Sequence, residues 1–339
     1  MNDIANPKIV AIIVTYNSEQ FIGTCLDSLL SEGYDNLEIL VVDNDSKDKT
    51  IDVLADYKNI ILIKRPNEGF GRSANLATEV VHESDYIFFL NPDTKIEIGF
   101  INSIKPYLIK YLNENVIIIP QQQTFNKEFL TCGNGMDIFG FSRWYQSIDE
   151  INKVFYADGA ALVITKRAFE KLGGFDPDYF MFHEDVDLSW KAHLLGIHFI
   201  QAQDAIVYHW SGGCLEGGAL KNGKLTTSTT RRYFGERNCL TSLLKNYSSF
   251  TLIWLLPISV IMNLCEMIFF LILLKPKISL CYIRAYMWNL SNLKCILIKR
   301  REIQNKRVVP DKEIMEKMCW TSAKIRLFLG IGLPKFISH

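Results

Sequence analysis

Four short apolar segments, separated by helical patterns, constrain the fold of this chain more than any other feature. The segments are Ile9–Thr15, Glu38–Asp43, Ile60–Lys64 and Tyr86–Leu90, and the patterns between them are Gln20–Leu30, Thr50–Tyr57 and Gly71–Val81. Apolar strands that alternate with helices predict βαβ units and an α/β fold with a mostly parallel sheet flanked by helices. Ser18 and Asp48 are the predicted N-caps of the first two helices.

Polar residues follow three of these segments at their carboxyl ends. They are Thr15-Tyr16-Asn17, Asp43-Asn44-Asp45 and Asn91-Pro92-Asp93. Ligands of parallel sheets bind beyond the carboxyl ends of the strands, so together these residues predict a binding site at one edge of the sheet. Each of them alone also fits the start of a loop or a helix N-cap, because Asn and Asp favour both.

Asp93 stands just past Pro92, which cannot donate a hydrogen bond to the sheet and so ends the strand. A carboxylate in that position is a ligand for Mg²⁺ or Mn²⁺, which prefer oxygen atoms and often bind substrate phosphates as well. The alternative is an N-cap for a helix after Lys95. His209 follows a predicted strand, His198–Val207, and is a candidate further ligand, although a lone histidine also fits a structural role.

A second acidic cluster, Glu184, Asp185 and Asp187, opens a helix predicted at Asp185–Leu195. Acidic residues in a first helical turn interact favourably with the helix dipole, which is one explanation for them. They also follow the aromatic run Tyr179–Phe182, and an apolar wall of that kind raises a carboxylate pKa and suits a general base.

Glycines at positions 69 and 71 precede the third predicted helix, with Arg65 and Arg72 close in sequence. Glycines before a helix let backbone N–H groups approach an anion, and arginines add charge-assisted bonds to a phosphate. The spacing fits neither a dinucleotide fingerprint nor a P-loop, so this signal is weak by itself.

Charge and cysteine content narrow the class of protein. The net charge of the 339 residues is zero, but residues 275–339 carry 14 Lys/Arg against 4 Asp/Glu, a local balance of +10. This asymmetry predicts an anionic partner for the tail, either nucleic acid or a membrane surface. The eight cysteines form no Cys-x-x-Cys pair, and residues 1–8 are short and polar, so we expect reduced thiols and no signal peptide.

The segment Phe250–Leu274 is long enough to cross a bilayer, but Asn263 and Glu266 interrupt it. Positive charge lies on both sides of it, which opposes a single span under the positive-inside rule. A monotopic or re-entrant helical element is therefore favoured over a span, a buried soluble helix or a dimer interface. The basic clusters Lys299-Arg300-Arg301 and Lys306-Arg307, amid Trp288, Trp320 and Phe328, are expected to lie on anionic lipid.

These motifs, taken in order, match a known family. The motifs are Val14-Thr15-Tyr16-Asn17, Val42-Asp43-Asn44-Asp45-Ser46, Pro66-Asn67-Glu68-Gly69-Phe70-Gly71, Asn91-Pro92-Asp93, Asp158-Gly159, and Gly173-Gly174-Phe175-Asp176 leading into Glu184-Asp185-Val186-Asp187. Over residues 9–210 the chain resembles family 2 inverting glycosyltransferases, most closely the rhamnosyltransferase-like bacterial branch. The resemblance implies a GT-A fold with a Rossmann-like sheet in residues 1–245, a nucleotide-binding half at about 1–120 and an acceptor half at about 121–245. Residues 246–339 would form a helical membrane-associating extension.

The resemblance also implies roles for individual residues. Those bordering the nucleotide-sugar would be Thr15, Tyr16, Asn17, Asp43, Asn67, Arg72, Asn75, Asp93 and Asp158. Asp93 matches the last acid of the DXD motif of the family, whose first acid is replaced here by Asn91, and His209 matches a late metal ligand. Asp185, with Glu184 beside it, matches the catalytic base.

The implied function is metal-dependent, inverting transfer of rhamnose or a similar sugar from a dTDP- or UDP-sugar to a hydroxyl of a saccharide or lipid-linked saccharide in cell-surface polysaccharide synthesis. We expect a peripheral or monotopic protein, with a possible homodimer, on the cytoplasmic face of the bacterial inner membrane. Three alternatives remain: an inactive scaffold, a nucleic-acid-binding protein acting through the tail, and a nucleotidyltransferase. The last would need a basic phosphate loop after the first strand, where the chain has Thr15–Ser18.

Overall fold

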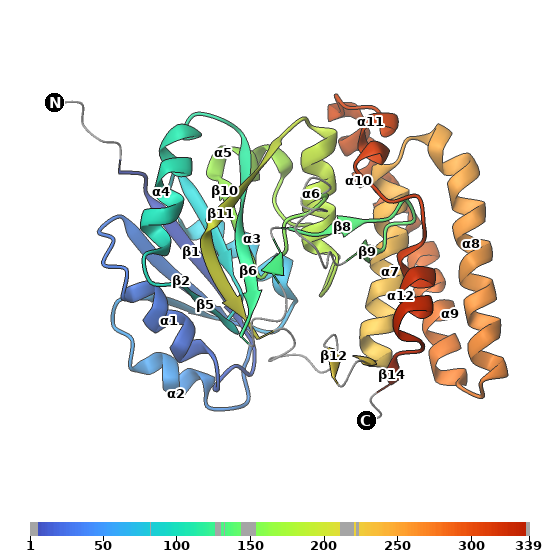
Figure 1. The fold of residues 1–339 in the computed structure, drawn as a ribbon, viewed down its shortest axis with the longest axis horizontal. Coiled ribbons are helices and arrows are strands. Elements are labelled where there is room, and N and C mark those ends of the chain that lie inside the picture. Colours follow the sequence, from blue (N-terminus) through green and yellow to red (C-terminus); the bar gives the residue numbers. More distant parts are fainter. Residues whose placement is uncertain are drawn as a thin grey trace.

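A mixed sheet and a group of C-terminal helices lie side by side in the molecule (Figure 1). The computed structural model describes residues 6–81, 83–125, 130–131, 133–143, 154–210, 220–221 and 224–336. The sheet and its helices form one side of the view, and the helices from α7 onward form the other.

The central sheet has nine strands. In spatial order they are β3 (Ile61–Lys64), β2 (Leu37–Asp43), β1 (Ile9–Thr15), β4 (Tyr86–Leu90), β10 (Ala161–Thr165), β6 (Val116–Thr124), β11 (His198–His209) and β5 (Thr94–Ile96), with β7 (Leu130–Thr131) beside β6. The first four strands are parallel, as predicted. Beyond β4 the pairing becomes mixed, since β10 runs antiparallel to both of its neighbours while β11 runs parallel to β6.

Side chains alternate between two apolar layers along each central strand, because successive residues of a strand point to opposite faces. In β1, Ile9, Ala11 and Ile13 pack against α1 (Ile22–Leu30), α2 (Thr50–Ala55) and α4 (Phe100–Lys110). Val10, Ile12 and Val14 pack on the opposite side, against α3 (Phe70–Val80), α5 (Lys166–Leu172) and α6 (Glu184–Leu194). Burial on both faces explains why these strands are almost wholly apolar.

The C-terminal helices share the second of these layers. They are α7 (Thr229–Asn246), α8 (Ser249–Ile272), α9 (Pro276–Ser291), α10 (Leu293–Lys306), α11 (Asp311–Glu316) and α12 (Ala323–Ile331). Tyr247, Leu255 and Met315 belong to the same buried cluster as the residues of α6. Short strands complete the described structure: β8 (Gly135–Met136), β9 (Ser142–Arg143), β12 (Leu220–Lys221), β13 (Lys224–Thr227) and β14 (Lys335–Phe336).

The two predicted helix caps differ from the observed ones. Helix α1 begins after Phe21, and the Ser18 side chain donates to the carbonyl of Tyr16 instead of capping the helix. At α2 the N-cap residue is Lys49, yet the Asp48 carboxylate still accepts the N–H of Thr50 at 3.0 Å. The Ser18 prediction was wrong, and the Asp48 prediction was displaced by one residue.

Helix α8 is, among the described residues, the one helix long and apolar enough to cross a membrane, and only 22% of its most apolar window is buried. Its interrupting carboxylate faces other helices. Glu266 pairs with Arg232 of α7 at 3.0 Å and with Lys324 of α12 at 2.8 Å. The amide N–H of Asn263 donates to the hydroxyl of Tyr286 of α9 at 3.1 Å. The polar groups of α8 are therefore satisfied within the protein.

Candidate active site

The polar residues that follow β1 and β2 are neighbours at one edge of the sheet. Thr15 and Asp43 lie opposite each other in the parallel register, and the N–H of Asn44 donates to the Thr15 carbonyl at 2.9 Å. Both side chains are buried, and the Thr15 hydroxyl has no hydrogen-bond partner there. The sheet edge therefore carries an unsatisfied polar atom, as a ligand site would.

The turn after β2 is held by the residues expected to face a nucleotide. The Asp43 carboxylate accepts both the N–H and the hydroxyl of Ser46, at 3.1 and 2.5 Å. Asn17, in a left-handed conformation with φ 50°, accepts the N–H of Lys47 at 2.7 Å, while its own N–H donates to the Ser46 hydroxyl. Tyr16 is exposed between them. Asp43 and Asn17 therefore stabilise the turn after β2, whether or not they also contact a ligand.

The glycine-containing loop before α3 packs against backbone. Gly69 has a φ of 94°, and a Cβ atom there would lie 2.3 Å from the carbonyl oxygen of Phe180. Asn67 accepts the Gly69 N–H at 3.1 Å. Arg65 and Arg72 both pair with Glu68, which compensates much of their charge.

Asn75 joins α3 to the segment after α5. Its side chain accepts the N–H of Phe175 at 2.9 Å and donates to the carbonyl of the same residue at 2.8 Å. A Cβ on Gly174, whose φ is 71°, would lie 2.6 Å from the Asn75 Oδ1 atom. The Gly173-Gly174 pair is thus explained by this close approach and by the left-handed end of α5.

Asp93 and His209, although 116 positions apart, face each other. After Asp93 the chain enters β5, which pairs with the end of β11, so the alternative of a helix N-cap is wrong. His209 Nε2 lies 3.3 Å from Asp93 Oδ1, and both side chains are largely buried. Burial lowers the pKa of His209, but the hydrogen bond to Asp93 and the charges of Asp93 and Asp158 outweigh it, so the net shift is upward.

One carboxylate and one imidazole form a partial cation site. Among the residues that the structure describes, no third His, Cys, Asp or Glu completes a cluster with them. A hard divalent cation commonly takes one or two protein ligands and completes its shell with substrate phosphate oxygens and water. Asp93 and His209 therefore fit a cation that is bound together with a phosphate-containing substrate.

Glu184 and Asp185 begin α6, after an unusual backbone. Phe182 and His183 both adopt positive φ, at 63° and 69°. Two such non-glycine residues in succession cost roughly 1–3 kcal/mol each, and they persist only where the surroundings hold them. The Asn238 amide of α7 supplies part of that support, since it donates to the carbonyls of Met181 and Phe182 at 2.8 and 2.7 Å.

The two carboxylates differ in their contacts. Asp185 accepts the N–H of Gly159 at 3.0 Å and that of Val186 at 2.8 Å. The Oε2 atom of Glu184 is buried without a hydrogen-bond partner. Burial raises the pKa of both groups. Asp158 adds to the rise at Asp185, and Asp185 adds to the rise at Glu184. A carboxylate whose proton is held near neutral pH is suited to proton transfer.

Several residues of α7 at the site carried no recognisable sequence signal. Asp187 is fully buried and pairs with Lys245 of α7, which also binds Asp176. Asn238, described above, belongs to the same helix, and so does Arg231, whose guanidinium carbon lies 4.7 Å from the centroid of the Phe182 ring. All of these α7 residues lie more than 40 positions after the acidic cluster, so only the fold brings them to it.

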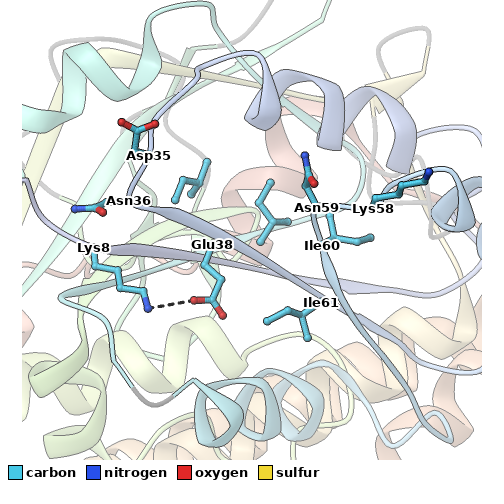
Figure 2. A pocket seen from close by; sticks show the side chains of 10 residues that line it. Lys8, Asp35, Asn36, Glu38, Lys58, Asn59, Ile60 and Ile61 are labelled. Carbon is cyan, nitrogen blue, oxygen red and sulfur yellow. Dashed lines mark ion pairs between the residues drawn. The ribbon is translucent and has the colours of Figure 1, made fainter.

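An open hollow of about 560 Å³ lies elsewhere, at the amino ends of β2 and β3 (Figure 2). Lys8 and Glu38 form an ion pair of 3.2 Å in its lining. None of the predicted site residues lines it. Because ligands of such sheets bind at the carboxyl ends of the strands, this hollow is separate from the candidate site.

Comparison with known proteins gives a family match and several relatives. Residues 10–173 match the family described as Glycosyl transferase family 2. Rhamnosyltransferase WbbL of Escherichia coli is 27% identical over 223 residues, which cover 58% of this chain and 82% of WbbL. O-antigen chain rhamnosyltransferase RfbN of Salmonella typhimurium is 24% identical over 210 residues, covering 60% of this chain and 66% of RfbN. Other curated relatives are matched over a much smaller part of their own length, which falls to 13% in one of them.

A solved structure supports the fold. The mannosyltransferase PcManGT from Pyrobaculum calidifontis, in complex with GDP-Man and Mn²⁺, matches 84% of this chain over 88% of its own, with a TM-score of 0.50 and 16% sequence identity. At that identity the likeness shows the fold alone. It confirms the predicted GT-A arrangement of the central sheet and its helices.

Proposed function

We propose that the protein is an inverting sugar transferase, on the premise that residues 10–173 match the family described as Glycosyl transferase family 2. Its donor would be a dTDP- or UDP-sugar carrying rhamnose or a similar sugar, because WbbL and RfbN are rhamnosyltransferases. Its acceptor would be a hydroxyl of a saccharide or lipid-linked saccharide. The catalytic part is assigned to residues 1–245.

The observation that carries this proposal is the pairing of two different groups at one sheet edge. Asp93 and His209 face each other at 3.3 Å, and the half-buried Asp185 is fixed on α6 by two backbone N–H groups. In the proposed reaction, Asp185 takes the proton from the acceptor hydroxyl as that oxygen attacks the anomeric carbon. Glu184 stands beside it as the alternative base.

The donor would lie along the carboxyl ends of β1, β2 and β4. Its proposed contacts are Thr15, Tyr16, Asn17, Asp43, Asn67, Arg72, Asn75, Asp93 and Asp158. Asp93 and His209 would hold Mg²⁺ or Mn²⁺ there. When bound, the cation neutralises negative charge on the leaving nucleoside diphosphate.

Calorimetric titration with dTDP and with UDP, each in Mn²⁺ and in EDTA, tests the proposal. We expect one nucleoside diphosphate to bind only with the cation, and the tighter nucleotide identifies the donor class. Asp93→Ala should weaken this cation-dependent binding of the nucleotide. If neither nucleotide binds to the folded protein, the transferase assignment fails and the inactive scaffold is favoured.

The contacts of the basic tail within the protein argue against the nucleic-acid alternative. Lys299 pairs with Asp176 and Asp178, and Arg300 donates to the carbonyls of Leu244 and Tyr247 at the end of α7. Arg307 pairs with Asp311, and Lys324 with Glu236 and Glu266. Four of the 14 Lys/Arg residues of the tail are therefore engaged inside the protein. A nucleic-acid partner would reveal itself by strongly salt-dependent binding.

We also propose that residues 246–339 associate with an anionic membrane surface, on the cytoplasmic side. The polar groups of α8 turn inward, whereas exposed apolar side chains cover its outer side and that of α9: Phe250, Ile253, Ile261, Leu264 and Ile268, then Leu280, Ile283, Met287 and Leu290. Exposed cations such as Lys277, Arg284 and Lys294 accompany them. An apolar helix face with accompanying Lys and Arg is typical of interfacial association.

Flotation with vesicles of phosphatidylcholine and phosphatidylglycerol tests this location. The wild-type protein should float, and the double variant Ile253→Glu, Ile261→Glu should not. Ile98→Glu is the matched control, because Ile98 is even more exposed than Ile253 and Ile261 but lies just before α4. Flotation of the double variant at the wild-type level would exclude α8 as the contact.

A further inference from the structure

The segment that leads into Glu184 contacts two other parts of the protein. The ring of Phe234, on α7, stacks on the ring of Phe180 with the centroids 5.5 Å apart. The N–H of Phe70, at the start of α3, donates to the Phe180 carbonyl at 3.1 Å. The segment is therefore held by α7 and by the glycine-containing loop just before it enters the acidic cluster.

Asn238 of α7 holds the end of this segment. Its side-chain amide donates to the carbonyls of Met181 and Phe182, at 2.8 and 2.7 Å. Its side-chain oxygen accepts the Nε–H of Arg237 at 2.7 Å, and the residue is 1% exposed. Because a guanidinium can only donate and a carbonyl can only accept, these three contacts fix the direction of the amide.

The carbonyls that Asn238 binds lie where the backbone is least favourable. Phe182 and His183 have positive φ, which residues other than glycine seldom adopt. Helix α6 starts directly from this turn, since the His183 carbonyl accepts the N–H of Asp187 at 2.8 Å. A relaxed turn would change the direction of the first turn of α6. It would thereby move Asp185 away from the Gly159 N–H that it accepts at 3.0 Å.

We infer that Asn238 is a positioning residue, whose amide holds the left-handed turn that places Asp185 for the transfer of the acceptor proton. In that step the proton of the hydroxyl passes to the Asp185 carboxylate, and the oxygen forms its bond to the anomeric carbon. The nucleoside diphosphate leaves with the electron pair of the bond that breaks. A base that is already in place lowers the entropic cost of reaching the transition state. This inference rests on the proposed function.

Turnover and nucleotide binding of Asn238→Ala, in the full-length protein with Mn²⁺, test the inference. The substrate is dTDP-rhamnose or UDP-glucose, according to which nucleoside diphosphate binds the wild type more tightly. Water takes the place of the acceptor hydroxyl, and turnover is the rate at which the nucleoside diphosphate is released. We expect kcat to fall about 10- to 100-fold, the effect of a misplaced catalytic group. The Kd of the nucleoside diphosphate should change little, because its proposed contacts lie on other elements.

Gln304→Ala is the matched control. The Gln304 amide of α10 donates to two successive carbonyls, those of Lys245 and Asn246, at 3.1 and 2.9 Å. Its oxygen accepts a bond from Arg307 at 3.1 Å. The substitution therefore removes the same set of bonds as Asn238→Ala, but at the other end of α7. Its kcat should stay close to that of the wild type.

Amide hydrogen exchange at Gly159 reports on the position of Asp185 without any turnover, since this N–H donates to the Asp185 carboxylate. Exchange at Gly159 should be several-fold faster in Asn238→Ala than in the wild type or in Gln304→Ala. Unchanged exchange at Gly159 in Asn238→Ala would overturn the inference.

The remaining outcomes separate this inference from the proposed function. If the wild type neither binds a nucleotide nor releases one, the proposed function fails, and this inference fails with it. If the wild type is active but Asn238→Ala keeps its kcat, or loses no more than Gln304→Ala, the positioning role is refuted. Should Asn238→Ala unfold in a thermal scan, Asn238→Asp replaces it. Aspartate keeps the shape and can pair with Arg237, but its carboxylate has no N–H to donate, so the same loss of kcat is expected and normal turnover would refute the role.

Discussion

Replacing Lys245 by methionine should destabilise the protein strongly, because Lys245 is the shared partner of two buried carboxylates. Its ammonium group contacts Asp187 at 3.0 Å and also pairs with Asp176, and the three side chains are at most 5% exposed. Methionine fills a similar volume but leaves both carboxylates short of a cation. Breaking a buried pair in this way costs about 3–5 kcal/mol.

Neighbouring cations limit the loss of stability in Lys245→Met. Lys299 also pairs with Asp176, and Lys191 lies 3.8 Å from Asp187, so part of the negative charge stays compensated. In a thermal scan of a chain of 339 residues, the change corresponds to a fall of roughly 4–7 °C in the unfolding midpoint. Lys299→Met is the matched control, and because this lysine is 23% exposed its loss should have a smaller effect.

The pH dependence gives the sharper test. Burial raises the pKa of Asp176, but Lys245 and Lys299 outweigh it and hold that pKa below its usual value. A carboxylate with a depressed pKa stabilises the fold above its unfolded pKa of about 4, and this contribution is lost as the pH falls further. The stability gap between wild type and Lys245→Met should therefore be widest at neutral pH and narrow below about pH 4. A gap under 1 kcal/mol, or one of constant size across pH, would refute the reasoning.

Three further predictions concern the site. Asp185→Asn should lower the turnover rate about 10²- to 10⁴-fold while donor binding stays nearly intact, and normal turnover would remove Asp185 as the base. In the wild type, burial and Asp158 raise the pKa of Asp185 to about 7, so the deprotonated base forms as the pH rises and kcat/KM should climb through that value; a profile flat from pH 5 to 9 would contradict this. Gly174→Ala should lower stability by about 1–3 kcal/mol in chemical denaturation, because its φ is 71° and the new Cβ would lie 2.6 Å from Asn75; stability equal to wild type would exclude that clash.

The sequence predicts the first half of the fold well because its signals there are local. Apolar runs such as Tyr86–Leu90 have no amphipathic alternative, and the polar residues after them mark where each strand ends. The mixed half of the sheet was not predicted. Strand β10, Ala161–Thr165, pairs antiparallel with β4, and this pairing depends on contacts far apart in the chain.

The sequence predicts site residues whose own chemistry marks them as ligands or bases. It does not predict roles that depend on which residues lie beside them in the fold. Asp93 and His209 were singled out by their chemistry, but only the pairing of β5 with β11 brings them together. Glu266 is visible in the sequence as a carboxylate that interrupts an apolar helix. The sequence does not show that Arg232 and Lys324 lie beside it and pair with it. The role of Lys245 likewise comes from tertiary contacts alone.

The sharing of one core between the sheet and the C-terminal helices affects how the chain matures during synthesis. Asp137 accepts the N–H of Ala323 at 2.6 Å across 186 positions, and the Cys319 backbone bonds to Met136 and Ile138. At ribosomal elongation rates, that interval takes about 10–40 s to traverse. For that time the nascent sheet exposes apolar surface that nothing yet covers. Chaperone holding at the ribosome, or early capture of the chain by a membrane, would therefore be expected to raise the yield of folded protein.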